Sequence, residues 1–237
     1  MAGEGRGIIL SRREVALGLS ALPLVGCAAT GPDADVQFIP AHKAAALKPH
    51  DPQRLLELIK LDPTIRLDMR YATTNNFTGR VLYDEARAFL ATPAALAVVR
   101  ASKAAQADGF GLTIYDAYRP WRITKKLWDA TPVGPKKEYV ANPKRGSKHN
   151  RGCAVDLTLH DLQTGQLVEM PTGFDDFSDK AHRDYRGATA VASAHRARLA
   201  GYLEAEGFVG LSNEWWHFDF TGWAQFPVMD IPFNKIR

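Results

Sequence analysis

The stretch that decides the fold is Ser147-Lys148-His149-Asn150-Arg151-Gly152-Cys153-Ala154-Val155-Asp156. It places a histidine and an aspartate seven positions apart, with a glycine between them. The residues from Ala154 to Leu159 are mostly apolar or β-branched, which predicts a strand. A buried strand normally excludes a carboxylate unless that carboxylate is paired or binds a metal, so Asp156 indicates a site rather than a core position.

A second polar intrusion lies far downstream, in Glu214-Trp215-Trp216-His217-Phe218-Asp219-Phe220. A single histidine or aspartate is usually structural, but two ligand-type side chains in two apolar strands favour a metal site. Imidazole nitrogen and carboxylate oxygen both suit Zn²⁺, and a catalytic zinc keeps three protein ligands and one position for water. We therefore predict that one zinc ion per chain is bound by His149, Asp156 and His217. Glu214 then stands beside the third ligand as a base for the water.

The same residues resemble a known family. The pattern Ser-x-His-x-x-Gly-x-Ala-x-Asp followed by Glu-x-x-His is similar to that of the zinc D-alanyl-D-alanine peptidases. Three longer agreements narrow the resemblance to the D-Ala-D-Ala dipeptidase branch, which includes the vancomycin-resistance dipeptidases. They are Arg70-Tyr71-Ala72-Thr73-Thr74-Asn75-Asn76-Phe77-Thr78-Gly79, Asp116-Ala117-Tyr118-Arg119-Pro120 and Glu214-Trp215-Trp216-His217. The resemblance runs from about Leu61 to about Pro227 and implies zinc-dependent hydrolysis of the D-Ala-D-Ala dipeptide.

The resemblance also implies roles for residues around the metal. Arg119 would stabilise the charge that develops on the substrate carbonyl oxygen, a role that suits a fixed guanidinium. Asp175 would contact the substrate amino group, since an acid is the right partner for an ammonium. Ser147 would bind the other end of the dipeptide, and Tyr71 would lie near it. Such a geometry would exclude longer peptides.

Other functions remain open at this point. A D,D-carboxypeptidase or a cell-wall endopeptidase could use the same zinc site, and activity on the dipeptide against a pentapeptide stem would discriminate them. Two histidines and one carboxylate also describe an iron(II) oxygenase site, in which Glu214 has no evident task. A non-catalytic peptidoglycan-binding lipoprotein would need neither Glu214 nor Arg119.

The order of the predicted elements indicates the α+β class. Thr92 and Pro93 open a helix that ends at Gly109, with Leu96 and Val99 on its buried side. Helices and strands do not alternate as β-α-β units require. We therefore expect an antiparallel sheet flanked by helices, with the zinc cleft over the sheet, and we expect His160, at the end of the metal strand, to be exposed.

The N-terminal residues predict targeting rather than fold. Arg12 and Arg13 precede a short apolar run, which is typical of an export signal over residues 1–26. Leu24-Val25-Gly26-Cys27 resembles a bacterial lipobox, so Cys27 would carry lipid and anchor the protein to the membrane. Residues 27–51 then form a tether and residues 52–237 the zinc dipeptidase domain, facing the periplasm. The alternative is an amphipathic helix on a cytoplasmic protein.

Composition adds two exclusions. The chain has 237 residues, 46% of them hydrophobic and 24% charged, with a net charge of +4, which is typical of one globular domain with a tail. No lysine–arginine run with interleaved aromatic residues occurs, so nucleic acid is not an expected partner. Of the two cysteines, Cys27 is assigned to lipid, so we expect no disulfide and interpret Cys153 as a small buried residue.

Overall fold

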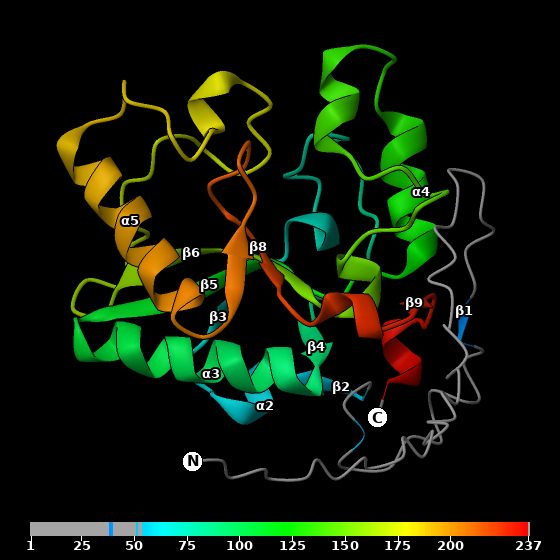
Figure 1. Ribbon diagram of the computed structural model, residues 1–237, viewed down its shortest axis with the longest axis horizontal. Helices are drawn as coiled ribbons and strands as arrows, with labels where there is room; N and C mark the ends of the chain where they lie inside the picture. Colours follow the sequence, from blue (N-terminus) through cyan, green and yellow to red (C-terminus); the bar gives the residue numbers. More distant parts are fainter. Residues whose placement is uncertain (1–37, 40–50, 52–53, 237) are drawn as a thin grey trace, which may run out of the picture. The chain divides into compact units, whose positions relative to one another are not determined.

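The computed structural model describes residues 38–39, 51 and 54–236 (Figure 1). The predicted export signal, the lipidation site at Cys27 and nearly all of the predicted tether lie outside the described residues. Among the residues that are described, none of the helices combines the length and the apolar character needed to cross a bilayer.

The described elements form a main sheet, two small strand pairs and several helices. The strands are β1 (Phe38–Ile39), β2 (Leu55–Glu57), β3 (Arg66–Leu67), β4 (Phe89–Ala91), β5 (Phe110–Asp116), β6 (Ala154–Asp161), β7 (Phe208–Gly210), β8 (His217–Phe220) and β9 (Val228–Met229). The α-helices are α2 (Leu58–Leu61), α3 (Thr92–Ala107), α4 (Trp121–Ala130) and α5 (Ala190–Glu204). A short 3₁₀ turn, η3 (His149–Arg151), leads into β6.

The main sheet has the strand order β3-β5-β6-β8-β7. Its pairs are antiparallel except for the edge pair β3–β5, which is parallel. Helix α3 packs against β5, and α5 contacts both α3 and β7, whereas α4 lies away from them (Figure 1). The predicted α+β class with an antiparallel sheet and flanking helices is confirmed, and the parallel edge pair is an addition to it.

The register of the sheet places three functional side-chain positions in one row. Asp116 of β5 is paired with Asp156 of β6, and Asp156 is paired with His217 of β8. A shift of register between Ile114 and Asp116 marks a bulge at the end of β5. Bulges of this kind re-aim side chains beside active sites. Residues far apart in the sequence therefore meet at neighbouring positions across three strands.

The predicted helix exists, but its buried face is not the predicted one. Leu96 is 44% exposed, and the buried side is formed by Ala94, Ala97, Val98 and Ala101 among other small residues. Small side chains let a helix approach the sheet closely, which leaves no room for leucine on that face. Moreover, the helix begins at Thr92 itself, whose hydroxyl donates to main-chain carbonyls of the preceding segment instead of capping the helix.

The prediction that His160 is exposed is wrong. The strand β6 continues to Asp161, and His160 is only 1% exposed. Its partner across the ladder is Gly111, and the imidazole ring occupies the space where a Cβ at Gly111 would stand, 2.3 Å away. Its Nδ1 lies 2.9 Å from the Thr113 hydroxyl. Because Gly111 has no side chain, it leaves room for the buried ring of His160. The residues next to His160 in the sequence do not indicate this burial.

Cys153 is buried, as expected. It lies with Ala91 and Phe226 in a small apolar cluster, and burial raises the pKa of its thiol to about 12. A thiol with such a pKa stays protonated at neutral pH and is a poor nucleophile.

Candidate metal centre

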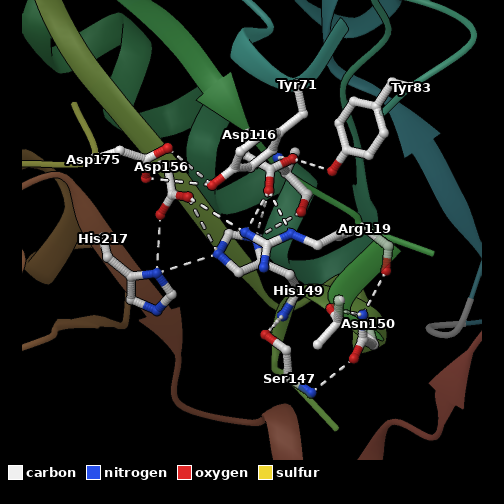
Figure 2. A network of polar contacts seen from close by, with 12 residues as sticks. Tyr71, Tyr83, Asp116, Arg119, Ser147, His149, Asn150, Asp156, Asp175 and His217 are labelled. Atoms are coloured by element: carbon white, nitrogen blue, oxygen red, sulfur yellow. Dashed lines mark hydrogen bonds and ion pairs between the residues drawn. The ribbon is translucent and has the colours of Figure 1, made fainter. Parts of the chain in front are cut away.

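Three predicted ligands converge at the end of the sheet. His149 Nε2 lies 3.2 Å from His217 Nδ1 and 3.4 Å from the Asp156 Oδ2 atom, and His217 Nδ1 lies 2.9 Å from Asp156 Oδ1 (Figure 2). All three residues are buried, and their ligand atoms lie within 4.8 Å of one another. Two nitrogens and one carboxylate oxygen are a donor set that suits zinc.

The hydrogen bonds behind the two histidines decide which nitrogens face the centre. His149 Nδ1 lies 2.7 Å from the Ala117 carbonyl oxygen, to which it can only donate. His217 Nε2 lies 2.9 Å from Asp219 Oδ1, an acceptor as well when that acid is ionised. A neutral His149 ring therefore carries its lone pair on Nε2, facing His217 Nδ1 and the Asp156 carboxylate. His217 has a carboxylate at each ring nitrogen, so its Nδ1 can hold a proton or bind a cation. Such an arrangement calls for a proton or a cation between them, so the residues fit a bound metal.

The electrostatics of the cluster agree with this geometry. Burial works to raise the pKa of Asp156, but the two histidines overcome it and hold this pKa well below its usual range. Burial works to lower the pKa of His217, while hydrogen bonds to Asp156 and Asp219 raise it well above its usual value. The cluster therefore keeps its carboxylate ionised and attracts positive charge.

Glu214 lies beside the third ligand in a buried position. Its Oε2 is 3.8 Å from His217 Nδ1, and 10% of its side chain is exposed. Burial raises the pKa of Glu214 to about 7, with further repulsion from Asp156 and a partial offset from His217. A carboxylate whose pKa is near neutrality is suited to accept and return a proton.

Arg119 is fixed by a carboxylate that the sequence analysis did not identify. Its Nε and a terminal nitrogen lie 2.9 and 2.7 Å from Asp116 Oδ2, and the Tyr83 hydroxyl donates to Asp116 Oδ1 at 2.6 Å. The guanidinium also lies 3.9 Å from Asp156 Oδ2. The signal that could have indicated this pair is the spacing of Asp116 and Arg119, three positions apart within one matching segment.

Tyr71 and Asp175 meet beside the centre, and the centre of the Tyr71 ring lies 5.3 Å from the Arg119 guanidinium carbon (Figure 2). The Tyr71 hydroxyl donates to both carboxylate oxygens of Asp175, at 3.3 and 3.2 Å. Asp175 has a φ of 59°, a left-handed conformation that is uncommon outside glycine. Burial, and then repulsion by Asp156 and Glu214, raises the pKa of Asp175 well above its usual value. A positively charged partner would therefore stabilise the ionised form of Asp175.

Ser147 is held in the turn before the first ligand. Its hydroxyl accepts from the His149 main-chain N–H at 3.2 Å, and its own N–H donates to Asn150 Oδ1 at 2.7 Å. Asn150 in turn donates to the Arg119 carbonyl oxygen at 2.7 Å and to the Thr124 hydroxyl at 2.8 Å. Asn150 therefore ties the turn to the start of α4, a role that the sequence analysis missed.

A cavity of about 700 Å³ opens onto the metal centre. Its lining includes all the residues predicted for the site, namely Tyr71, Arg119, Ser147, His149, Asp156, Asp175, Glu214 and His217. The structure brings them together from five separate segments of the sequence, although their individual roles stay predictions.

Comparisons with known proteins give one consistent result. Residues 51–234 match the family model described as D-ala-D-ala dipeptidase. A D-alanyl-D-alanine dipeptidase of Escherichia coli (strain K12) is 35% identical over 184 residues, which cover 78% of this chain and 93% of that protein. One of Enterococcus faecium is 34% identical over 171 residues, covering 65% of this chain and 85% of that protein.

One similar solved structure has a lower sequence identity. A vancomycin-resistance D,D-pentapeptidase from a VanB-type resistance cassette, crystallised with Zn(II), is 18% identical and has a TM-score of 0.37. The match covers 60% of this chain and 79% of that one. This similarity is too low to carry an inference about the present chain.

Proposed function

Because the chain belongs to the D-alanyl-D-alanine dipeptidase family of metallopeptidases, we propose that it hydrolyses the D-Ala-D-Ala dipeptide at the centre formed by His149, Asp156 and His217. The observation that supports this most is the convergence of two histidine ring nitrogens on one buried carboxylate, with the three ligand atoms within 4.8 Å of one another. His149 Nε2, the Asp156 carboxylate and His217 Nδ1 would hold one zinc ion. A zinc ion there would supply a Lewis acid and lower the pKa of a water molecule toward neutrality.

Glu214 is the proposed general base. Its carboxylate would take a proton as water attacks the peptide carbonyl and would give this proton to the leaving amine. The pKa of about 7 suits both halves of this cycle, because the ionised and the protonated forms are then close in free energy. The buried position beside His217 supports the assignment.

Arg119 is the proposed group for the negative charge on the carbonyl oxygen. Asp116 holds the guanidinium through two of its nitrogens, so the side chain needs no reorganisation when the charge develops. Burial works against the charged form, but the attraction of Asp116 raises the pKa of Arg119 well above its usual value. The group therefore stays charged throughout the reaction.

Asp175 would bind the amino group of the dipeptide, with Tyr71 orienting the carboxylate. An ammonium group beside Asp175 would lower its pKa and pair a buried charge. In a longer peptide this nitrogen is an uncharged amide, so no positive charge would offset the cost of ionising the buried Asp175. Ser147 would contact the other end of the dipeptide. Longer peptides would then be excluded for two reasons: they lack the ammonium group that pairs with Asp175, and they are too long to fit between Asp175 and Ser147.

The test is an assay of the purified protein on D-Ala-D-Ala and on a pentapeptide stem ending in D-Ala-D-Ala, with metal analysis of the same sample. Zinc with turnover of the dipeptide alone supports the proposal. Turnover of the stem would indicate a carboxypeptidase or endopeptidase, and iron without peptidase activity an oxygenase. Zinc without any turnover would indicate a binding module.

We further propose that the protein is exported and anchored through lipid on Cys27, facing the periplasm. The support is the sequence alone: Arg12-Arg13, the apolar run and Leu24-Val25-Gly26-Cys27. A dipeptidase placed there would degrade dipeptides outside the inner membrane and recover D-alanine, rather than deplete the cytoplasmic pool used for wall synthesis. Lipid labelling and fractionation of cells with the wild type and with Cys27→Ala test this, and unprocessed wild-type protein in the cytosol would contradict it.

A further inference from the structure

The two histidine ligands are supported by different kinds of group. His149 donates to a main-chain carbonyl, that of Ala117, whereas His217 donates to a side chain, the Asp219 carboxylate. The other oxygen of Asp219 accepts from Lys148 Nζ at 2.6 Å. Only 10% of the Asp219 side chain is exposed, against 35% of the Lys148 side chain. His217, Asp219 and Lys148 are therefore linked by two successive side-chain contacts, which we call the His217–Asp219–Lys148 relay. It is partly buried and lies on the side of His217 away from the other two ligands.

We propose that Asp219 and Lys148 are positioning residues that set the metal affinity of the site, an inference that rests on the proposed zinc centre. Asp219 accepts the Nε2 proton of His217 and orients the ring, so that Nδ1 points to Asp156 and His149 and is available to a metal. Lys148 holds the Asp219 carboxylate in place. Carboxylates behind a ligating histidine orient the ring and raise its basicity, and their removal typically costs 10–100-fold in metal affinity.

The sheet gives Asp219 a rigid position for this task. His217 and Asp219 lie two residues apart on β8 and share one face of the strand. Asp219 is paired with Ala154 of β6 on one side and with Val209 of β7 on the other. Since β8 is bonded on both edges there, the carboxylate is held against the imidazole by the backbone.

Lys148 connects the two ligand-bearing segments. It directly precedes the first ligand, His149, yet its ammonium reaches the carboxylate behind the third ligand, 71 positions further along the chain. Its carbonyl oxygen accepts from the N–H groups of Arg151 and Cys153, which fixes its main chain in the turn before β6. Its ammonium also lies 5.3 Å from the centre of the Trp223 ring. The lysine thus fixes the spacing between the two ligand segments that zinc must bridge.

The test is the dissociation constant for zinc, measured by competition with a chromophoric chelator on the full-length variants. Asp219→Ala should weaken zinc binding about 10–100-fold. Asp219→Asn should lose less of the zinc affinity than Asp219→Ala, because the amide oxygen can still accept a hydrogen bond from His217 Nε2. Lys148→Met should weaken binding as well, and Lys148→Arg should restore most of the loss because it keeps the charge. Thermal unfolding of the metal-free proteins shows whether each variant is folded.

Lys125→Met is the matched control. Lys125 pairs with Asp129 at 2.5 Å on the surface of α4, and both side chains are more than half exposed. This variant removes a lysine from an ion pair without touching the centre, so its zinc affinity should equal that of the wild type.

The outcomes separate this inference from the proposed function. Wild-type zinc affinity in folded Asp219→Ala and Lys148→Met, with the wild type active, overturns the relay and leaves the dipeptidase intact. An equal loss in Lys125→Met overturns it too. If Asp219→Ala does not fold, the zinc affinities of Lys148→Met and Lys148→Arg decide whether the relay is correct. A wild type that neither binds zinc nor cleaves the dipeptide overturns the proposed function itself.

Discussion

Replacing Glu214 by glutamine removes the proposed proton acceptor while keeping the size of the side chain. Because burial raises the pKa of Glu214 to about 7, the neutral acid is already accommodated in the folded protein. The amide should therefore change the free energy of unfolding by no more than about 1 kcal/mol. The zinc ligands are unchanged, so the metal should stay bound.

The expected effect is on turnover. A general base contributes about 10²–10⁴-fold, which at about 1.4 kcal/mol per factor of ten corresponds to about 3–5 kcal/mol of activation free energy. We expect a fall in kcat of this size for D-Ala-D-Ala, with zinc content confirmed on the same sample. The matched control is Glu138→Gln, since Glu138 lines the same cavity but is exposed to solvent. Near-normal turnover by a zinc-loaded Glu214→Gln protein would refute the assignment.

Three further substitutions test the role of Arg119, the burial of His160 and the pairing of Glu57. Arg119→Lys should keep zinc but lower kcat about 10²–10³-fold, since lysine cannot reproduce the held guanidinium, and steady-state kinetics measure this. Gly111→Ala should destabilise by about 1–3 kcal/mol in urea unfolding, because its methyl group meets a buried ring at 2.3 Å, whereas Gly201→Ala on α5, with nothing within 4 Å, should stabilise slightly. Arg87, bonded at 2.8 Å to Glu57, lowers the pKa of that acid to about 2. Since this folded pKa lies below the usual 4.5, the stabilisation is present above pH 4.5 and is lost toward pH 2. Arg87→Ala should therefore cost about 1–3 kcal/mol at pH 7 and little at pH 2 in urea unfolding, and an equal difference at both values would contradict the pairing.

The metal ligands could be predicted because their signal is local. A carboxylate in the apolar run around Asp156 and a histidine among the aromatic residues around His217 each violate the pattern of a buried strand. A function that uses buried polar groups leaves such violations in the sequence. The class of the fold followed from the order of the elements, which local patterns also reveal.

The supporting residues could not be predicted, because they depend on register. Nothing near Asp116 in the sequence says that it lies beside Asp156 on the neighbouring strand, or that Tyr83 donates to it. The burial of His160 depends in the same way on a glycine in another strand. The prediction that Leu96 is buried is wrong for a related reason. Hydrophobic periodicity indicates a helix, but it does not show which face of the helix packs against the sheet. Pairing across strands is a property of the folded chain.

If His149, Asp156 and His217 hold the zinc on which dipeptide hydrolysis depends, bound zinc and turnover must be lost and restored together. The most direct test measures zinc per chain and D-Ala-D-Ala turnover on one sample of the wild type, before chelation, after chelation and after zinc is restored. The same measurement is made on His149→Ala and His217→Ala. We expect one zinc per chain, activity that disappears and returns with it, and no tight binding in either variant. Full turnover by the metal-free protein, or stoichiometric zinc in either variant, would contradict this assignment of the metal ligands.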